Sequence, residues 1–506
     1  MAAMRLASTE SKAPAESKAS IGAPRPVAAW WLPAGVAVAS AVVFALVRSY
    51  LIDDAYITLS YAENLAFHGH WGLIEEGTAN TATSPLNVLA LAALTFVVRD
   101  AVLAAGVLFV LCQVSVAFAL RRLGARAGLP SWFAPLAAGL LLVNPLLVSS
   151  IGLELALGSA VLLWLFVFSV ERRPVEFGLA LGLLALVRLD LLVVAAVIFF
   201  ARRDFWLGIW RTTFAALAVT VPWFLFSWTV LGSAVPDTLI IKTLQQSWGP
   251  WDFTNGPLVY WRHFPIATML SFLPLVAGAL IGLLWTVRYR QGSERAKRLQ
   301  PFAVLAIAGA VHYVTYVWLT VPPYHWYYGP SIIAATVFVA ASASVVERVR
   351  VGVFAVAAAV IAWSATVSVV LDRQHDYSAI TTNHASSERY QQIGRELGAL
   401  ANGRVVRSAG EIGALAYSCQ CAIVDIFSDR GSLTPAIIES KNRSGPLGRA
   451  LIEANFRFLD QTVPPTLPDL VLEETWNKVP PGVLASWDIS SPWTGSQHLY
   501  LRPLDG

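Results

Sequence analysis

The chain has 506 residues, of which 56% are hydrophobic and only 13% are charged. Soluble globular proteins carry about a quarter charged residues, so this composition, with a mean hydropathy of +0.59, predicts a polytopic membrane protein. The formal net charge of +4 is too small and too scattered to indicate nucleic-acid binding. The three cysteines predict no disulfide framework, because Cys112 lies in an apolar run and Cys419 and Cys421 are too close in sequence to bridge comfortably.

Residues 1–27 are rich in Ala, Ser, Lys and Pro and are predicted to form a disordered cytoplasmic tail. Residues 28–371 follow as a predicted all-α transmembrane domain of about eleven helices. A crossing needs about 20 apolar residues, or fewer where a segment is one arm of a hairpin. The predicted crossings are 28–48, 101–119, 131–149, 153–170, 175–187, 189–201, 206–231, 264–287, 301–320, 326–346 and 350–371.

The apolar run 86–98 is predicted to be a re-entrant or interfacial helix, because about 13 helical residues reach only about 20 Å. With this run left out of the count, every basic cluster falls on the side of the N-terminal tail. The positive-inside rule assigns that side to the cytoplasm. The clusters are Arg121/Arg122/Arg126, Arg172/Arg173, Arg202/Arg203/Arg211, Arg288/Arg290/Arg295/Lys297/Arg298 and Arg348/Arg350. The chain is therefore predicted to be a multi-pass protein of the cell membrane with a cytoplasmic N-terminus.

The C-terminal residues 372–506 differ in kind, because polar residues, Pro and Gly return there. The segments "GRVVRSAG", "EIGALAYS" and "AIVDIFSD" are typical of strand, helix and strand, and "VPPTLPDLVLEE" predicts a turn that leads into a further strand. We expect a small extracytoplasmic α/β domain. The predicted topology puts it on the same face as the outer loop 50–100 and the polar motifs of four other loops.

The acidic pair Asp53 and Asp54 follows the first predicted crossing. One interpretation is a helix N-cap with a second acid that complements the helix dipole. The other is catalytic, since ionised groups beside a bilayer are costly and adjacent helical residues point about 100° apart. In that interpretation Asp53 is the base and Asp54 an orienting acid.

Two further charged motifs face the same side. Glu154, in "GLELAL", is either a residue of the headgroup zone or part of an acceptor pocket. Arg188 and Asp190 lie at the tip of a predicted hairpin with short arms. Charges at that depth pair with one another or line a hydrated cavity, so they are either a structural pair or a site in which Arg188 meets a lipid phosphate.

The aromatic segment "PPYHWYYGP" contains Tyr324, His325 and Tyr328. An interfacial aromatic belt explains part of it, and a sugar- or phosphate-binding loop is the functional alternative. Lys242 is the main cation of the outer loop 232–263. It is either solvated or a second phosphate ligand.

The absence of several common motifs limits the cofactors and donor substrates that the protein is expected to use. The sequence contains no GxGxxG after a strand, no GxxxxGK[ST], no HExxH and no Cys/His metal set. An outward-facing enzyme also has no ready supply of nucleotide sugars or ATP, so an activated donor must arrive within the membrane. A polyprenyl-phosphate sugar fits this need. It requires a base for the acceptor hydroxyl, a cation for the leaving phosphate and an apolar groove for the lipid.

The stretch "DDAYITLSYAENLAFHGHWGLIEEGTANTATSPLNVL" resembles the first outer loop of GT-C fold glycosyltransferases, in particular the actinobacterial arabinofuranosyltransferase (AftB-like) branch. "NPLLVSSIGLELAL", "LVRLDLL", "YHWYYGP" and "AGEIGALAYSCQCAIVDIFSDRG" are similar to later family segments in the same order. The resemblance covers residues from about 51 to 430.

This resemblance implies inverting transfer of a sugar, with arabinofuranose favoured, from a polyprenyl-phosphate donor to a hydroxyl of a cell-envelope glycan or glycolipid. A mannose- or hexose-dependent transferase is the alternative, and a transporter or lipid flippase is the rival from another class. Some relatives bind a divalent cation near the acids, which makes Asp53 and Asp54 candidate ligands.

Overall fold

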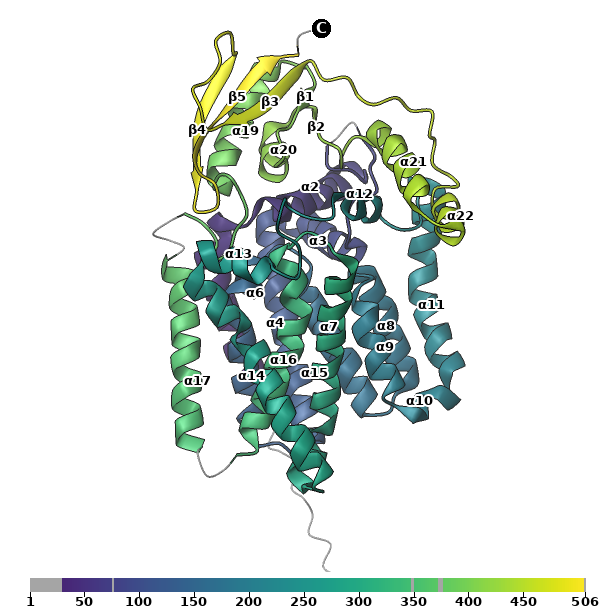
Figure 1. The fold of residues 1–506 in the computed structure, drawn as a ribbon, viewed down its shortest axis with the longest axis vertical. Coiled ribbons are helices and arrows are strands. Elements are labelled where there is room, and N and C mark those ends of the chain that lie inside the picture. The colour runs from purple at the N-terminus through teal and green to yellow at the C-terminus, as the bar shows by residue number, and fades with distance from the viewer. Residues whose placement is uncertain (1–29, 75–76, 347–349, 372–375, 505–506) are drawn as a thin grey trace, which may run out of the picture.

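The computed structural model describes residues 30–74, 77–346, 350–371 and 376–504. The predicted disordered tail, residues 1–27, lies outside this part of the chain. Long helices run side by side in one bundle, and a small sheet covers one end of it (Figure 1). Shorter helices lie across the bundle between these two parts.

Six helices in the described residues are long and apolar enough to cross a membrane. They are Trp31–Tyr50, Ala101–Arg126, Ile209–Leu231, Pro265–Arg290, Glu294–Leu319 and Val351–Ser368. In the labels of Figure 1 they contain α1 (Trp31–Val47), α4 (Ala101–Arg126), α11 (Ile209–Phe226), α14 (Pro265–Arg290), α15 (Glu294–Leu319) and α17 (Arg350–Ala365). Shorter apolar helices complete the bundle: α5 (Phe133–Leu142), α7 (Leu155–Val170), α8 (Pro174–Val187), α9 (Leu191–Phe200) and α16 (Gly329–Ser344).

Each predicted crossing thus contains a helix, but only six of these are long. The predicted crossing 131–149 differs most, because it is split into α5 and the short helix α6 (Pro145–Ser149). Asn144 causes the break: its side chain accepts hydrogen bonds from the N–H groups of Leu146 and Leu147 and so caps a new helix, while Pro145 cannot continue the earlier one. The helix α10 (Arg203–Leu207) likewise precedes α11 as a separate turn.

The helices that lie across the bundle end are α2 (Asp53–His68), α3 (Pro85–Val98), α12 (Thr238–Gln245) and α13 (Gly256–His263). The helix α3 corresponds to the run 86–98 and packs against α2 and α4. The helix α2 begins at the acidic pair and ends at Gly69, which has a left-handed backbone conformation. The C-terminal residues pack against these helices.

The C-terminal residues form a five-stranded mixed sheet with the strand order β2-β1-β3-β5-β4. Its strands are β1 (Val406–Arg407), β2 (Ile423–Val424), β3 (Leu470–Thr475), β4 (Ala485–Ser491) and β5 (Gly495–Pro503). The strand β1 pairs parallel with β2 and β3, whereas β5 pairs antiparallel with β3 and β4. The helices α19 (Ser387–Ala401), α20 (Gly413–Cys419), α21 (Leu433–Arg443) and α22 (Pro446–Asn455) accompany the sheet. The predicted strand, helix and strand over 403–429 are therefore present as β1, α20 and β2.

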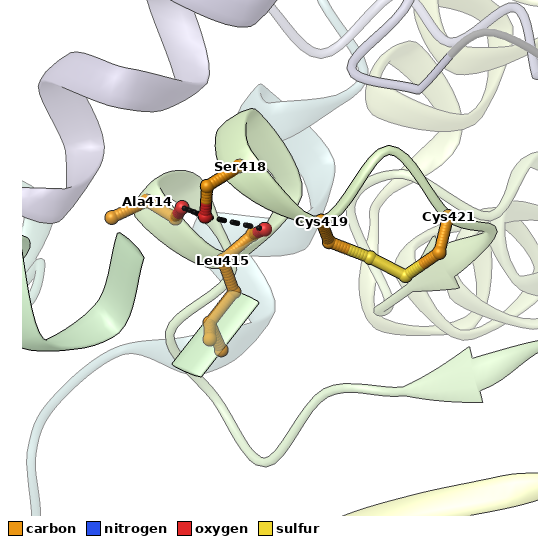
Figure 2. Close-up of a disulfide and its surroundings, with 5 residues drawn as sticks. All are labelled: Ala414, Leu415, Ser418, Cys419 and Cys421. Carbon is orange, nitrogen blue, oxygen red and sulfur yellow. Dashed lines mark hydrogen bonds between the residues drawn. A yellow bond between two sulfur atoms is a disulfide. The ribbon is translucent and has the colours of Figure 1, made fainter. Parts of the chain in front are cut away.

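The prediction that Cys419 and Cys421 do not pair is wrong. The structure joins them in a disulfide that closes the C-terminal end of α20 (Figure 2). Gln420 has a left-handed backbone conformation with φ of 50°, and this turn brings the two Cα atoms to 5.1 Å. That separation lies inside the usual range for disulfides, so the turn overcomes the short sequence spacing.

Candidate functional site

A cavity of about 220 Å³ lies where α2, the loop before α3, α12 and the C-terminal residues meet. Its carboxyl-bearing residues come from four separate parts of the chain, and its aromatic residues come mainly from the loop before α16. The carboxyl-bearing residues are Asp53, Asp54, Glu154, Glu411 and Asp425. Among the residues that the structure describes, Lys242 is the only basic one that lines it. The cavity is thus strongly acidic, with a single cation in its wall.

Asp53 is buried, and both of its carboxylate oxygens accept hydrogen bonds from the backbone. One carboxylate oxygen accepts from the N–H groups of Ile412 at 3.1 Å and Gly413 at 2.8 Å. The other accepts from the N–H of Ala414 at 2.7 Å. These donors form the start of α20, where the free N–H groups and the helix dipole both favour a negative charge. Burial raises the pKa of Asp53 to about 6, although the backbone donors oppose the shift.

The close approach of α20 to α2 requires glycine at position 413. A Cβ atom at Gly413 would lie 2.0 Å from the backbone oxygen of Asp53, a distance that no side chain can tolerate. The N–H of Asp53 also donates to the side chain of Asn383 at 3.2 Å. Asp53 therefore connects the membrane part of the chain to the C-terminal sheet region through both its backbone and its side chain.

Asp54 lines the same cavity as Asp53, but no other described residue donates a hydrogen bond to its carboxylate, whereas that of Asp53 accepts three. Burial raises the pKa of Asp54, while the charge of Lys242 opposes the shift. A carboxylate with a raised pKa and free oxygens is suited to accept a proton from a bound hydroxyl group.

Glu411 also lines the cavity, and the sequence analysis did not single it out. Its carboxylate accepts from the side chain of Asn383 at 2.7 Å and from the N–H of His384 at 3.0 Å. Burial, followed by the charge of Asp53, raises the pKa of Glu411 to about 8. The signal in the sequence was a carboxylate in the otherwise apolar "AGEIGALA", within a segment quoted for the family resemblance.

We expect the thermal stability of the purified protein to fall between pH 5 and pH 8. A glutamate in the unfolded chain has a pKa of about 4.3. Glu411 in the folded protein has a pKa of about 8. In this range the folded protein keeps a proton that the unfolded chain has lost. The free energy of unfolding therefore falls by ~1.4 kcal/mol per pH unit for that proton.

The measurement is the melting temperature of wild-type and Glu411→Gln protein at several pH values. The variant cannot ionise at this position, so its melting temperature should depend less steeply on pH. Glu388→Gln is the matched control, because Glu388 is exposed on α19. An equal slope in all three proteins would contradict the assignment of this proton to Glu411.

The Thr-rich segment before α3 positions α12. The side chain of Asn80 donates to the side chains of Ser227 and Ser233, and its backbone oxygen accepts from the N–H of Asp237 at 2.8 Å. The hydroxyl group of Thr238 donates to the backbone oxygen of Thr81 at 2.9 Å. These contacts fix the start of α12 and therefore the direction in which Lys242 points.

Lys242 lies between the acidic cavity and a second cavity of about 380 Å³, and it lines both. Its Nζ atom lies 4.2 Å from the ring centroid of Tyr324, a cation–π arrangement. Within the described part of the chain no carboxylate forms an ion pair with it. Lys242 is thus a cation without a counter-charge in direct contact, at the junction of two cavities.

The second cavity is mainly apolar. Its walls include Leu189, Val193, Leu239, Leu319 and Val321. Leu239 and Leu319 are 57% and 49% exposed, so these walls continue onto the outer surface. Leu319 is the last residue of α15, one of the helices long and apolar enough to cross a membrane.

Arg188 lies at the junction of α8 and α9 and forms a buried network. Its guanidinium donates to Glu154 at 2.5 Å, to Asp190 at 2.8 Å and to the hydroxyl group of Tyr316 at 3.0 Å. The second oxygen of Asp190 lies 3.0 Å from Nε2 of His312. Glu154 lines the acidic cavity and Arg188 and Asp190 line the apolar one, so this network forms the wall between them.

The aromatic loop divides between the cavity and the core. Tyr324 and Trp326 line the acidic cavity. His325 is buried beside the rings of Tyr260 and Trp326, and Tyr328 is stacked on Phe253 with its hydroxyl group donating to the Phe253 backbone oxygen. His325 and Tyr328, predicted as binding residues, line neither of the two cavities.

The donor set does not fit a divalent cation at the acidic pair. Three backbone N–H groups already donate to the carboxylate of Asp53, so within the pair Asp54 is the carboxylate with both oxygens free of such donors. Among the described residues no three His, Cys, Asp or Glu side chains are grouped to hold a metal ion. The chemistry below therefore uses only the side chains of the chain itself.

The fold and the two cavities define a multi-pass integral membrane protein with a GT-C-like fold. No protein-family model and no curated protein matches the chain. Among solved structures it is similar to ArnT from Cupriavidus metallidurans bound to undecaprenyl phosphate, with a TM-score of 0.56 and 14% identity over 94% of this chain and 98% of that chain. It is also similar to the arabinofuranosyltransferase AftD from Mycobacteria, with a TM-score of 0.45 and 15% identity over 87% of this chain and 35% of that chain.

Proposed function

We propose that this protein is a glycosyltransferase that moves a sugar from a polyprenyl-phosphate donor to a hydroxyl group of a cell-envelope glycan or glycolipid. The observation that carries the proposal is the meeting of an acidic cavity and an apolar cavity at Lys242. A lipid-linked sugar has the same three parts: a polar sugar, an anionic phosphate and an apolar chain. The fold shared with ArnT, which was solved with undecaprenyl phosphate bound, supports this arrangement.

The side chains have distinct roles in this mechanism. Asp54 removes the proton from the acceptor hydroxyl group, because its carboxylate is free and its pKa is raised by burial. The acceptor oxygen then bonds to the anomeric carbon of the sugar as the bond from that carbon to the phosphate oxygen breaks. Attack from the side opposite the phosphate inverts the anomeric centre.

Lys242 holds the departing phosphate, whose negative charge grows as the bond breaks. Its ammonium group is not neutralised by a carboxylate in direct contact, whereas Arg188 already binds Glu154 and Asp190. Arg188 therefore maintains the wall between the cavities and offers the phosphate at most its remaining N–H groups. The sequence favoured Asp53 as the base, but its carboxylate accepts three backbone N–H groups, so the proposed role of Asp53 is instead to position Asp54 by fixing the start of α2 against α20.

The sugar is assigned from the sequence resemblance, which favours arabinofuranose, with mannose or another hexose as the alternative. A transporter or flippase is disfavoured, because the acidic cavity is formed where α2, α12 and the C-terminal residues meet, at one end of the helix bundle.

The extracytoplasmic location of this end is supported by two features. The basic clusters of the sequence lie on loops of the opposite side in the predicted topology. The Cys419–Cys421 disulfide lies on the side of the site, and disulfides persist mainly in oxidising compartments outside the cytoplasm.

The decisive experiment is a donor screen with purified protein in nanodiscs. Polyprenyl-phosphate arabinofuranose, mannose and glucose are each offered with cell-envelope glycan fragments, and mass spectrometry of the acceptor reports the product. Transfer from one donor identifies the sugar. Absence of transfer from every lipid-linked donor, with a folded protein, would refute the proposed activity.

We expect Lys242→Ala to raise the KM for the lipid-linked donor and to lower kcat by about a hundredfold, the typical cost of losing one charge-stabilising group. The KM for the acceptor should change little. Lys242→Arg, which keeps the charge, should retain part of the activity. Steady-state kinetics with both substrates varied provides the test, and a pure acceptor effect would contradict the role given to Lys242.

A further inference from the structure

The helix α22 presents an apolar stripe to the outside of the protein. Leu447 and Leu451 are 75% and 62% exposed, and Phe458 just after the helix is 49% exposed. Spacings of four and seven residues put these side chains and Ala454 on one face of a helix. An exposed stripe of this kind on a chain surface indicates a contact surface.

The stripe lies directly beside a membrane-spanning helix. The indole N–H of Trp228, in the π-helical turn Ser227–Leu231 that ends α11, donates to the backbone oxygen of Ala454 at 2.8 Å. The ring of Trp228 also packs edge-on against Phe458, with 5.0 Å between centroids. Figure 1 shows α22 alongside the upper end of α11. The stripe is therefore at the depth where α11 leaves the bilayer.

The bilayer-facing surface of α11 continues into this stripe. Leu225, Phe226 and Val230, on the last turns before Leu231, are 53%, 42% and 60% exposed. Apolar side chains at these positions of a spanning helix face lipid. The ring of Trp228, next to these residues, contacts Phe458 of the stripe, and aromatic residues of this kind are common at membrane interfaces.

The other faces of α22 and of the residues that follow it are also consistent with a position at the membrane surface. Ile452 and Phe456 turn toward the protein, where Phe456 packs with Leu459 and residues of α21 and α12. Arg449 and Glu453 are exposed on a different face from the stripe. Residues 439–458 contain four basic and two acidic side chains, which favours contact with phosphate headgroups.

The surface matters because it is attached to the wall of the site. Ile240 and Ile241 of α12 pack against Leu433 and Ile437 of α21 in one small cluster. Lys242 is the next residue of α12. A membrane contact of α22 is thus connected, through α21, to the helix that carries the cation between the two cavities.

We propose that α22 is an interfacial membrane anchor, with Leu447, Leu451 and Phe458 inserted into the headgroup and acyl boundary of the leaflet at this end of α11. The partner is the phospholipid surface itself. The anchor holds the α21–α22 unit, and with it α12, at a fixed depth relative to the bilayer. This inference is independent of the transferase activity.

The test uses site-directed spin labelling of the full chain in nanodiscs of phosphatidylcholine and phosphatidylglycerol. Cys112→Ala removes the one cysteine that is not in the disulfide. Single cysteines are then introduced as Leu447→Cys and Leu451→Cys, with Glu453→Cys as the control on the polar face and Leu467→Cys as an exposed apolar control. Leu467 is 84% exposed and lies in the segment 463–468, which has no helix or strand.

The labels at 447 and 451 should collide with oxygen more often than with a water-soluble nickel complex, as labels in the acyl region do. The labels at 453 and 467 should show the reverse ratio. Because all four positions are exposed, the labels should leave the melting temperature nearly unchanged. Equal nickel accessibility at 451 and 453 would overturn the proposal, and so would a label at 451 shielded from both reagents, since that result indicates a protein partner.

Discussion

Replacing Asp54 with Asn is expected to lower the rate of sugar transfer by at least about a hundredfold, because a general base of this kind contributes a factor of roughly 10² to 10⁴. The amide cannot accept the proton of the acceptor hydroxyl group. The fold should be preserved, because no other described residue donates a hydrogen bond to the Asp54 carboxylate. The measurement is kcat with saturating donor and acceptor, together with the melting temperature.

Asp53→Asn is the matched comparison, since it makes the same chemical change one residue earlier. Here one oxygen that accepts backbone N–H groups is replaced by an amino group, which cannot accept them. Losing charge-assisted hydrogen bonds of this kind costs about 2–4 kcal/mol, so the main expected effect is a lower melting temperature. If the Asp53→Asn protein were stable but inactive and the Asp54→Asn protein stayed active, Asp53 would be the base and Asp54 the positioning residue.

Arg188→Ala is expected to have the largest effect on stability. It leaves the carboxylates of Glu154 and Asp190 inside the wall between the cavities without their shared cation. Removing one partner of a buried ion pair costs about 3–5 kcal/mol. Glu154 lines the acidic cavity and Asp190 lines the apolar one. In the fraction of the variant that folds, the KM values for donor and acceptor should therefore both rise.

Arg122→Ala is the control for this change. Arg122 pairs with Glu171, but its side chain is 38% exposed and Glu171 keeps Arg126 as a second partner. Exposed ion pairs contribute about 0–1 kcal/mol, so the melting temperature should barely move. Thermal unfolding followed by fluorescence compares the two variants. If Arg188→Ala were as stable as Arg122→Ala and impaired only donor binding, Arg188 would be a phosphate ligand instead of a structural centre.

The helices and the grouping of the polar loops could be predicted from the sequence. Apolar runs and basic flanks were enough to indicate that Asp54, Glu154 and Lys242 face one side, and the structure brings all three to one cavity. Hydropathy depends on local composition, so it locates helices well. It did not reveal the break at Asn144, because the capping bonds that cause the break involve single side chains.

The environment of each site residue depends on contacts that are distant in sequence. The partners of Asp53 lie about 360 positions later in the chain, so nothing near "LIDDAY" distinguishes it from Asp54. Glu411 was missed for the same reason. Neighbouring residues can also differ in environment. The four residues His325–Tyr328 form one tight turn, in which Trp326 lines the cavity and His325 is buried in the core.

The contact between Asp53 and α20 has a consequence for how often the chain crosses the bilayer. Hydrogen bonds of about 3 Å join the start of α2 to residues 412–414, so both segments must lie on the same side of the membrane. The number of crossings between them is therefore even. Ten of the predicted crossings fall in this interval, and counting α3 as well would make the number odd. The hydrogen bonds between Asp53 and residues 412–414 thus constrain the topology of the chain, and with the ten predicted crossings they imply that α3 returns to the side from which it starts.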